Sequence, residues 1–279
     1  MRDKTIKLIE AAAEVLREHN PMTLRQVYYQ LVAKHVIDNN RAEYQRLSGA
    51  LVKARQDELI PWDWIEDRGR LPRTVNMWCD LSDFMNTVRH AYRKDIWESQ
   101  PQYVEVWLEK DALSGIFSDI TGEYGVTLAV GRGYNSWSAY HDAAERFNGH
   151  KEQGRDGVIL YFGDFDPSGE DIFRAIGDSL DFFGTCPTIE KVALTMQDVR
   201  DHNLPPDFTK TTDSRSKAHV AKHGDIAVEL DALPLPVLQE KIREAIEGSL
   251  DKSRFVAARE IERQETLQLA DLIEGRRKK

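Results

Sequence analysis

Four short apolar runs in the middle of the chain limit what it can fold into. They cover residues 103–108 (YVEVWL), 127–130 (TLAV), 157–162 (GVILYF) and 191–195 (KVALT). Each of the first three precedes a stretch with helical spacing, and strands that alternate with helices are typical of a parallel sheet in an α/β fold. We therefore predict an α/β domain over residues 101–235, built on a mainly parallel, Rossmann-like sheet.

The segment before this domain has the pattern of helices followed by a wing. Helical spacing covers residues 3–18, Thr23 is a candidate N-cap for a helix over 24–35, and a further helix is expected over 41–57. The run IPWDWIEDRGRLPR at 60–73 then predicts two short strands joined by a turn. Because helices followed by a β-wing are typical of a winged helix-turn-helix, we expect a DNA-binding domain over residues 1–75.

The remaining segments connect or extend these two domains. Residues 76–100 are predicted to form a connecting helix, and the stretch 201–225 is polar and irregular. Helical spacing returns after it. We expect C-terminal helices and a basic tail over residues 236–279.

Basic side chains in the first domain are candidates for contacts with double-stranded DNA. Arg46, Lys53 and Arg55 lie on the helix predicted over 41–57, and Arg68 and Arg70 lie in the predicted wing. Their alternative role is that of a solvated helix surface. The whole chain has a net charge of −9 and a pI near 5.5, which counts against a protein that coats nucleic acid without specificity. Any contact with DNA is therefore expected to be local.

The sequence indicates a cytoplasmic protein, with association to the nucleoid left open. No run approaches the roughly 18 apolar residues that a membrane span requires, and the first residues alternate charged and apolar types, unlike a signal peptide. The two cysteines, Cys79 and Cys186, match neither a disulfide framework nor a zinc ribbon.

Acidic residues follow two of the predicted strands directly. Glu109 comes after the run at 103–108, and Asp164 and Asp166 follow the run at 157–162 through a glycine. Ligands of parallel α/β sheets collect at the carboxyl ends of the strands, so these carboxylates are expected to converge if the two strands are neighbours. Close carboxylates favour a hard divalent cation, and oxygen ligands with open positions suit Mg²⁺ bound together with a phosphodiester. Glu109 could also serve as a general acid or base. The alternative reading of residues 166–169 is a turn and helix cap.

A pair of tyrosines lies on the helix predicted over 24–35. Helical spacing places Tyr28 on the apolar stripe that should face the core, whereas Tyr29 lies off this stripe and is aligned with Arg25 at i, i+4. A nearby guanidinium would favour the phenolate form of Tyr29 and attract a phosphate. The alternative is that Tyr29 is an ordinary surface residue.

Several of these motifs, in this order, resemble one known family. The run Leu24–Tyr29 resembles the tyrosine motif of topoisomerase VI A subunits and their meiotic double-strand-break relatives. The segments 109–112 (EKDA), 131–134 (GRGY) and 164–169 (DFDPSG) resemble motifs of that family's Toprim domain. The resemblance covers most of the chain and implies a winged helix, then a Toprim domain, then C-terminal helices. The chain is shorter than a usual A subunit, and it resembles the reduced, stand-alone A-like proteins.

The resemblance implies an activity and a set of roles. Tyr29 would attack a DNA phosphodiester and form a 5′-phosphotyrosyl link, working with the metal site of the other protomer of a homodimer. Arg25 would position the phosphate, Asp164 and Asp166 would hold Mg²⁺ with Glu109, and Lys110 would add positive charge. The family uses a separate ATPase subunit, and this sequence has no ATP-binding motif. Two alternatives stay open: a hydrolytic nuclease in which Tyr29 is incidental, and a non-catalytic DNA-binding or sensing subunit of a larger complex.

Overall fold

The computed structural model describes residues 3–66, 75–131, 133–206, 219–221, 224 and 226–277. Its centre is a parallel sheet of four strands, β1 (Gln102–Leu108), β2 (Thr127–Val130), β3 (Asp156–Phe162) and β4 (Thr188–Ala193), in the order β2-β1-β3-β4. The predicted α/β class and parallel sheet are confirmed. Strand β4 begins and ends earlier than the predicted 191–195.

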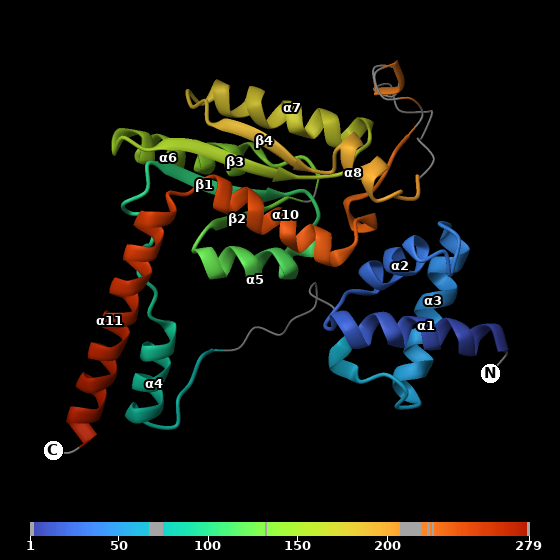
Figure 1. Ribbon diagram of the computed structural model, residues 1–279, viewed down its shortest axis with the longest axis horizontal. Helices are drawn as coiled ribbons and strands as arrows, with labels where there is room; N and C mark the ends of the chain where they lie inside the picture. The colour runs from blue at the N-terminus through green and yellow to red at the C-terminus, as the bar shows by residue number, and fades with distance from the viewer. Residues whose placement is uncertain are drawn as a thin grey trace.

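Helices cover both faces of this sheet (Figure 1). On one face lie α6 (Trp137–Glu152) and α7 (Pro167–Phe182), and on the other lie α5 (Ser114–Tyr124) and α10 (Leu235–Gly248). Alternate residues of β1 explain the two cores: Tyr103 and Trp107 pack with α6 and α7, whereas Val104 and Val106 belong to the core on the other side. Short helices η3 (Asp111–Leu113), α8 (Met196–Asp201) and η4 (Leu230–Ala232) complete the domain.

The N-terminal segment folds into α1 (Asp3–His19), α2 (Leu24–Ala33) and α3 (Arg41–Gln56), which confirms the helices predicted there. Helix α2 begins at a capping box, in which the Thr23 side chain accepts a hydrogen bond from the backbone N–H of Gln26 and Gln26 returns one. Helix α1 packs against both α2 and α3. Buried residues of these helices are continuous with the sheet core on the α5 and α10 side.

The predicted wing differs from the structure where it is described. Residues Trp62–Trp64 form a 3-10 turn, η1, instead of a strand, because Pro61 starts a helical turn that closes with a hydrogen bond from Trp64 N to Pro61 O. Ile65 forms only an isolated parallel bridge with Met22. The rest of the predicted wing, with Arg68 and Arg70, lies outside the described residues.

Two helices form an arm beside the domain. Helix α4 (Leu81–Ala91) is shorter than the predicted connecting helix at 76–100, since Asp80 caps its start and the chain turns again at Asp95 and Trp97. It packs against α11 (Lys252–Arg277), which extends away from the sheet (Figure 1). Helices α10 and α11 confirm the helical spacing predicted after residue 236. Within the described ranges, no helix is both long and apolar enough to cross a membrane.

Candidate functional site

The carboxyl ends of β1 and β3 bring the first predicted pair of acidic residues together. The two strands are hydrogen-bonded neighbours, and Glu109 N donates to Phe162 O at the end of β3. The carboxylate of Glu109 then accepts hydrogen bonds from the backbone N–H of Asp164 and from the hydroxyl of Tyr161, both at 3.0 Å. The expected convergence of residues 109 and 164 is therefore present in the fold.

Glycine at position 163 makes this approach possible. A Cβ atom at Gly163 would lie 2.5 Å from the carboxylate oxygen Oε2 of Glu109 and would also collide with the Tyr161 hydroxyl. Any side chain there would force Glu109 away from Asp164.

Asp166 lies at the start of α7 and caps it. Its Oδ1 accepts a hydrogen bond of 2.6 Å from Gly169 N, and Pro167 occupies the first turn of the helix. The alternative role of Asp166, that of a helix cap, is therefore confirmed. It engages only one of the two carboxylate oxygens.

Glu109, Asp164 and Asp166 offer the oxygen ligands that a divalent cation prefers, but their ligand atoms do not all lie within 4.8 Å of one another. Within the described chain, the second oxygen of each of Glu109, Asp164 and Asp166 makes no hydrogen bond. Among the same residues, the one group of three possible ligands whose atoms all lie within 4.8 Å of one another is His141, Asp142 and Glu145, which is exposed. A cation at the predicted site would therefore have to draw the carboxylates closer together.

The structure adds two acidic residues that sequence reasoning missed, Glu229 and Asp231. An antiparallel bridge between Phe165 and Val228 aligns this segment with the segment that carries Asp164, and Leu230 N donates to Asp164 Oδ1 at 2.8 Å. The run Glu229-Leu230-Asp231 repeats the acidic, apolar, acidic spacing of residues 164–166. This repeat is the feature of the sequence that could have indicated Glu229 and Asp231 as site residues. It follows a polar segment without a strand pattern, so the sequence did not place it at the sheet edge.

Lys110 lies at the centre of these carboxylates. Its Nζ is 2.9 Å from Asp164 Oδ1, 2.8 Å from Glu229 Oε2 and 3.6 Å from Asp231 Oδ2. Burial opposes its charge, but attraction to Asp231, Asp164 and Glu229 outweighs this and raises the pKa of Lys110 above its usual value. Lys110 is therefore a buried cation of the site.

The charge of Asp164 is only partly compensated. Burial raises the pKa of Asp164 to about 7, because the ion pair with Lys110 offsets only part of the cost of removing the carboxylate from water. The nearby negative charge of Glu109 acts in the same direction as burial.

Arg25 connects the tyrosine helix to this acidic cluster. Its Nε donates to Asp231 Oδ2 at 2.7 Å, and its guanidinium also pairs with Glu229. The same guanidinium lies 3.5 Å from the hydroxyl oxygen of Tyr29. Tyr29 thus lies directly beside the acidic cluster of its own chain, whereas the family resemblance implied a metal site on another protomer.

Tyr29 is not the surface residue of the alternative reading, and its surroundings do not favour the phenolate that we expected. The side chain is 5% exposed, because α2 packs against η4 and encloses it. Burial, together with a hydrogen bond to Glu229, raises the pKa of Tyr29 above its ordinary value, and the charge of Arg25 only partly opposes this. Tyr28 faces the core as predicted, and its hydroxyl bonds to residues 38–40.

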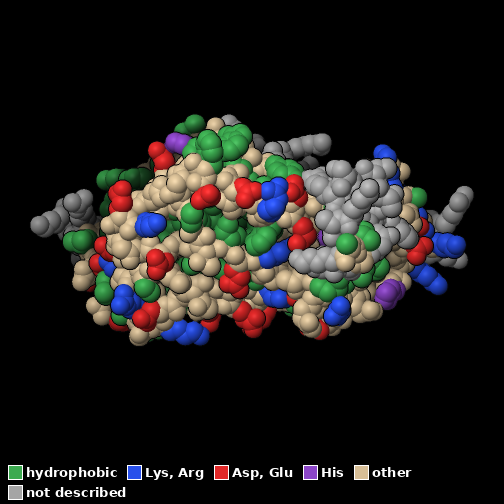
Figure 2. Space-filling view, turned by 90° about the horizontal axis from the view of Figure 1, so that it is seen from above, with side chains coloured by type: hydrophobic (Ala, Val, Ile, Leu, Met, Phe, Trp, Pro, Cys, Tyr) green, Lys and Arg blue, Asp and Glu red, His purple; other side chains and the backbone are tan. Residues whose placement is uncertain are grey.

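The predicted DNA-contacting residues of α3 do not join this site. Arg46 pairs with Glu43 at 2.7 Å, and Lys53 pairs with Asp57 at 2.6 Å. Arg55 instead lies over the ring of Trp62, and it is nine positions beyond Arg46 on the helix, which places the two on opposite sides of α3. On the face seen from the α7 side, acidic and basic side chains are interspersed (Figure 2).

Comparison of the chain with known protein families, with curated proteins and with solved structures finds no match. The candidate site therefore has to be interpreted from its own geometry.

Proposed function

We propose that this protein binds double-stranded DNA and cleaves a strand by Mg²⁺-dependent transesterification, in the manner of a topoisomerase VI A subunit. The observation that carries the proposal is the chain of contacts from Tyr29 through Arg25 to the carboxylates that surround Lys110. The proposed nucleophile, the proposed phosphate-binding cation and the acidic cluster thereby lie side by side. A homodimer of winged-helix and Toprim units, acting with a separate ATPase subunit, belongs to the same proposal.

In this reaction the Tyr29 oxygen attacks phosphorus while the bond to the 3′ oxygen of the neighbouring sugar breaks. The phosphate becomes linked to tyrosine, and the 3′ oxygen leaves and takes a proton. Arg25 would hold the phosphate, and Glu109 would act as the general acid that gives a proton to the leaving 3′ oxygen. Glu109, Asp164 and Asp166 would hold Mg²⁺, which when bound supplies positive charge to the phosphodiester and the leaving oxygen.

The proton on Tyr29 is the demanding part of this chemistry. Lys110 and Arg25 overcome the effect of burial and hold the pKa of Glu229 at about 2, so this carboxylate is a weak proton acceptor for the phenol. Entry of a phosphate would draw Arg25 away from Glu229 and make that carboxylate more basic. Deprotonation of Tyr29 is thus expected to accompany binding of DNA.

A hydrolytic nuclease is the second candidate, and one observation favours it. Tyr29 is buried and hydrogen-bonded as a neutral phenol, which suits a structural residue as well as a nucleophile. A DNA-binding subunit without its own activity is favoured by a different observation, since the positive charges of Lys110 and Arg25 compensate much of the negative charge of the cluster.

One experiment separates the three. The purified protein is incubated with supercoiled plasmid and Mg²⁺, stopped with denaturant, and analysed for nicked or linear DNA and for protein attached to DNA. Transesterification predicts cleavage and a covalent adduct, both lost in Tyr29→Phe and kept in Tyr92→Phe, whose hydroxyl bonds Glu265 on the α4 and α11 arm. Cleavage that persists in Tyr29→Phe supports hydrolysis, and binding without cleavage by the unmodified protein supports the non-catalytic subunit.

A further inference from the structure

A polar pocket opens beside Tyr29 on the side of α3. It has a volume of about 240 Å³ and lies between α2, the loop at 38–40 and the first turn of α3. Its lining consists of two arginines, two asparagines and three tyrosines, namely Arg25, Tyr28, Tyr29, Asn39, Asn40, Arg41 and Tyr44. No carboxylate lines it, although the chain as a whole is acidic.

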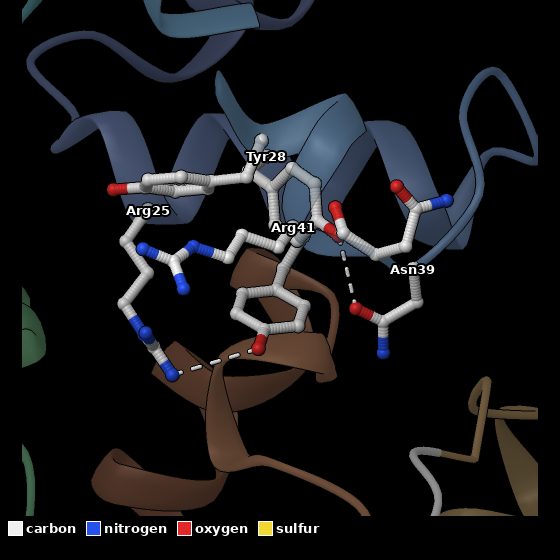
Figure 3. Close-up of a pocket in the computed structure, with 7 residues that line it drawn as sticks. Arg25, Tyr28, Asn39 and Arg41 are labelled. Carbon is white, nitrogen blue, oxygen red and sulfur yellow. Dashed lines mark hydrogen bonds between the residues drawn. The ribbon is translucent and has the colours of Figure 1, made fainter. Parts of the chain in front are cut away.

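Arg41 is the cation of this pocket that lacks a partner. Within the described part of the chain it forms no ion pair and no hydrogen bond, whereas Arg25 is engaged by Glu229 and Asp231. The guanidinium groups of Arg25 and Arg41 extend to the same side of the pocket (Figure 3). Because Arg25 is already paired with two carboxylates, Arg41 carries the uncompensated positive charge of the pocket, and this charge favours an anion.

Two further kinds of donor remain at the pocket, an amide nitrogen and backbone N–H groups of α3. Tyr28 donates to Asn39 Oδ1 at 3.0 Å and to Asn40 O at 3.1 Å, which fixes the loop and leaves the amide nitrogen of Asn39 as a donor. Asn40 caps α3 by accepting from Glu43 N, so the first backbone N–H groups of the helix, at residues 41 and 42, are not used by this cap. Exposed N–H groups at the start of a helix and guanidinium groups both prefer oxyanions.

We infer that this pocket binds a phosphate oxyanion, with Arg41 as the residue that positions it. The ligand can be a backbone phosphate of DNA or a free phosphate compound, since both present the same charged oxygens. Because Arg25 lines the pocket and also contacts the acidic cluster, a phosphate held there would lie next to Tyr29. The inference deepens the proposed function and rests on it for the DNA source, whereas binding of inorganic phosphate does not depend on cleavage.

The test compares Arg41→Gln with Arg174→Gln. Arg41 is exposed, so its replacement should leave the fold intact, and Arg174 is an exposed arginine of α7 paired with Asp171 and Asp178. Binding of a short DNA duplex is measured at several salt concentrations. Arg41→Gln is expected to weaken binding about tenfold and to reduce the slope of log K against log salt by about 0.9, the value of one lost phosphate contact. Arg174→Gln should leave both unchanged.

A second titration uses inorganic phosphate alone, followed by the amide NMR signals of residues 41 and 42. These signals should shift in the unmodified protein and in Arg174→Gln but not in Arg41→Gln. Phosphate binding without a change in the DNA slope would assign the pocket to free phosphate compounds and exclude the DNA source. An unchanged DNA slope together with unchanged phosphate binding in Arg41→Gln would overturn the inference. The two proposals can also fail separately. If Arg41→Gln alone loses phosphate binding and the unmodified protein does not cut plasmid, the pocket is established and the proposed cleavage is wrong.

Discussion

The contact between Arg25 and Asp231 is expected to hold α2 against the α/β domain. The side chain of Asp231 is completely buried, and it accepts from Arg25 at 2.7 Å while lying 3.6 Å from Lys110. Replacing Asp231 with Asn keeps the shape but removes the charge. Loss of one partner of a fully buried pair costs about 3–5 kcal/mol, and loss of a surface pair about 0–1 kcal/mol. Arg25 is 39% exposed and keeps Glu229, so we expect an intermediate loss of about 2 kcal/mol in the free energy of unfolding.

Urea denaturation measures this loss directly. If the free energy of unfolding decreases by roughly 3 kcal/mol per molar urea, the midpoint of the unfolding transition should fall by about 0.7 M urea. The control is Asp178→Asn, which removes an exposed partner of the exposed Arg174 and should leave the midpoint almost unchanged. A double-mutant cycle that adds Arg25→Met should give a coupling energy of about 1–2 kcal/mol. A coupling energy near zero would refute the reasoning, whatever the effect of the single variants.

Two further predictions concern the strand ends. The folded-state pKa of Asp164, about 7, lies above its usual value of 3.8, so between these values the folded protein binds a proton that the unfolded chain has released. Stability should therefore fall by up to about 1.4 kcal/mol per unit as the pH rises from about 4 to 7, and urea titrations at pH 5 and 8 should show that Asp164→Asn lacks this fall. Gly163→Ala should cost about 1–3 kcal/mol in thermal or urea unfolding and weaken Mg²⁺-dependent activity, because its Cβ would lie 2.5 Å from Glu109 Oε2. Gly149→Ala in α6, where a Cβ meets nothing within 4 Å, should be neutral or stabilising, and equal losses in both variants would contradict the prediction.

Local patterns in the sequence were sufficient for the sheet and for part of the site. The apolar runs of β1 and β3 are long enough to predict buried parallel strands, and the residue after such a strand must lie at the carboxyl edge of the sheet. The positions of Glu109 and Asp164 follow from that rule. Helix α2 was predictable for a similar reason, since the capping residue Thr23 and the apolar spacing after it are both local.

Only the tertiary structure decided which charged and aromatic side chains are buried and with which partners. Arg25 and Asp231 are 206 residues apart, and their contact depends on how α2 packs against η4, which no local spacing reports. The same packing buries Tyr29, which the helical pattern placed outside the apolar stripe. Periodicity identifies the side of a helix that prefers apolar surroundings, but a polar side chain can be buried where a distant partner compensates its loss of water by a hydrogen bond or an opposite charge.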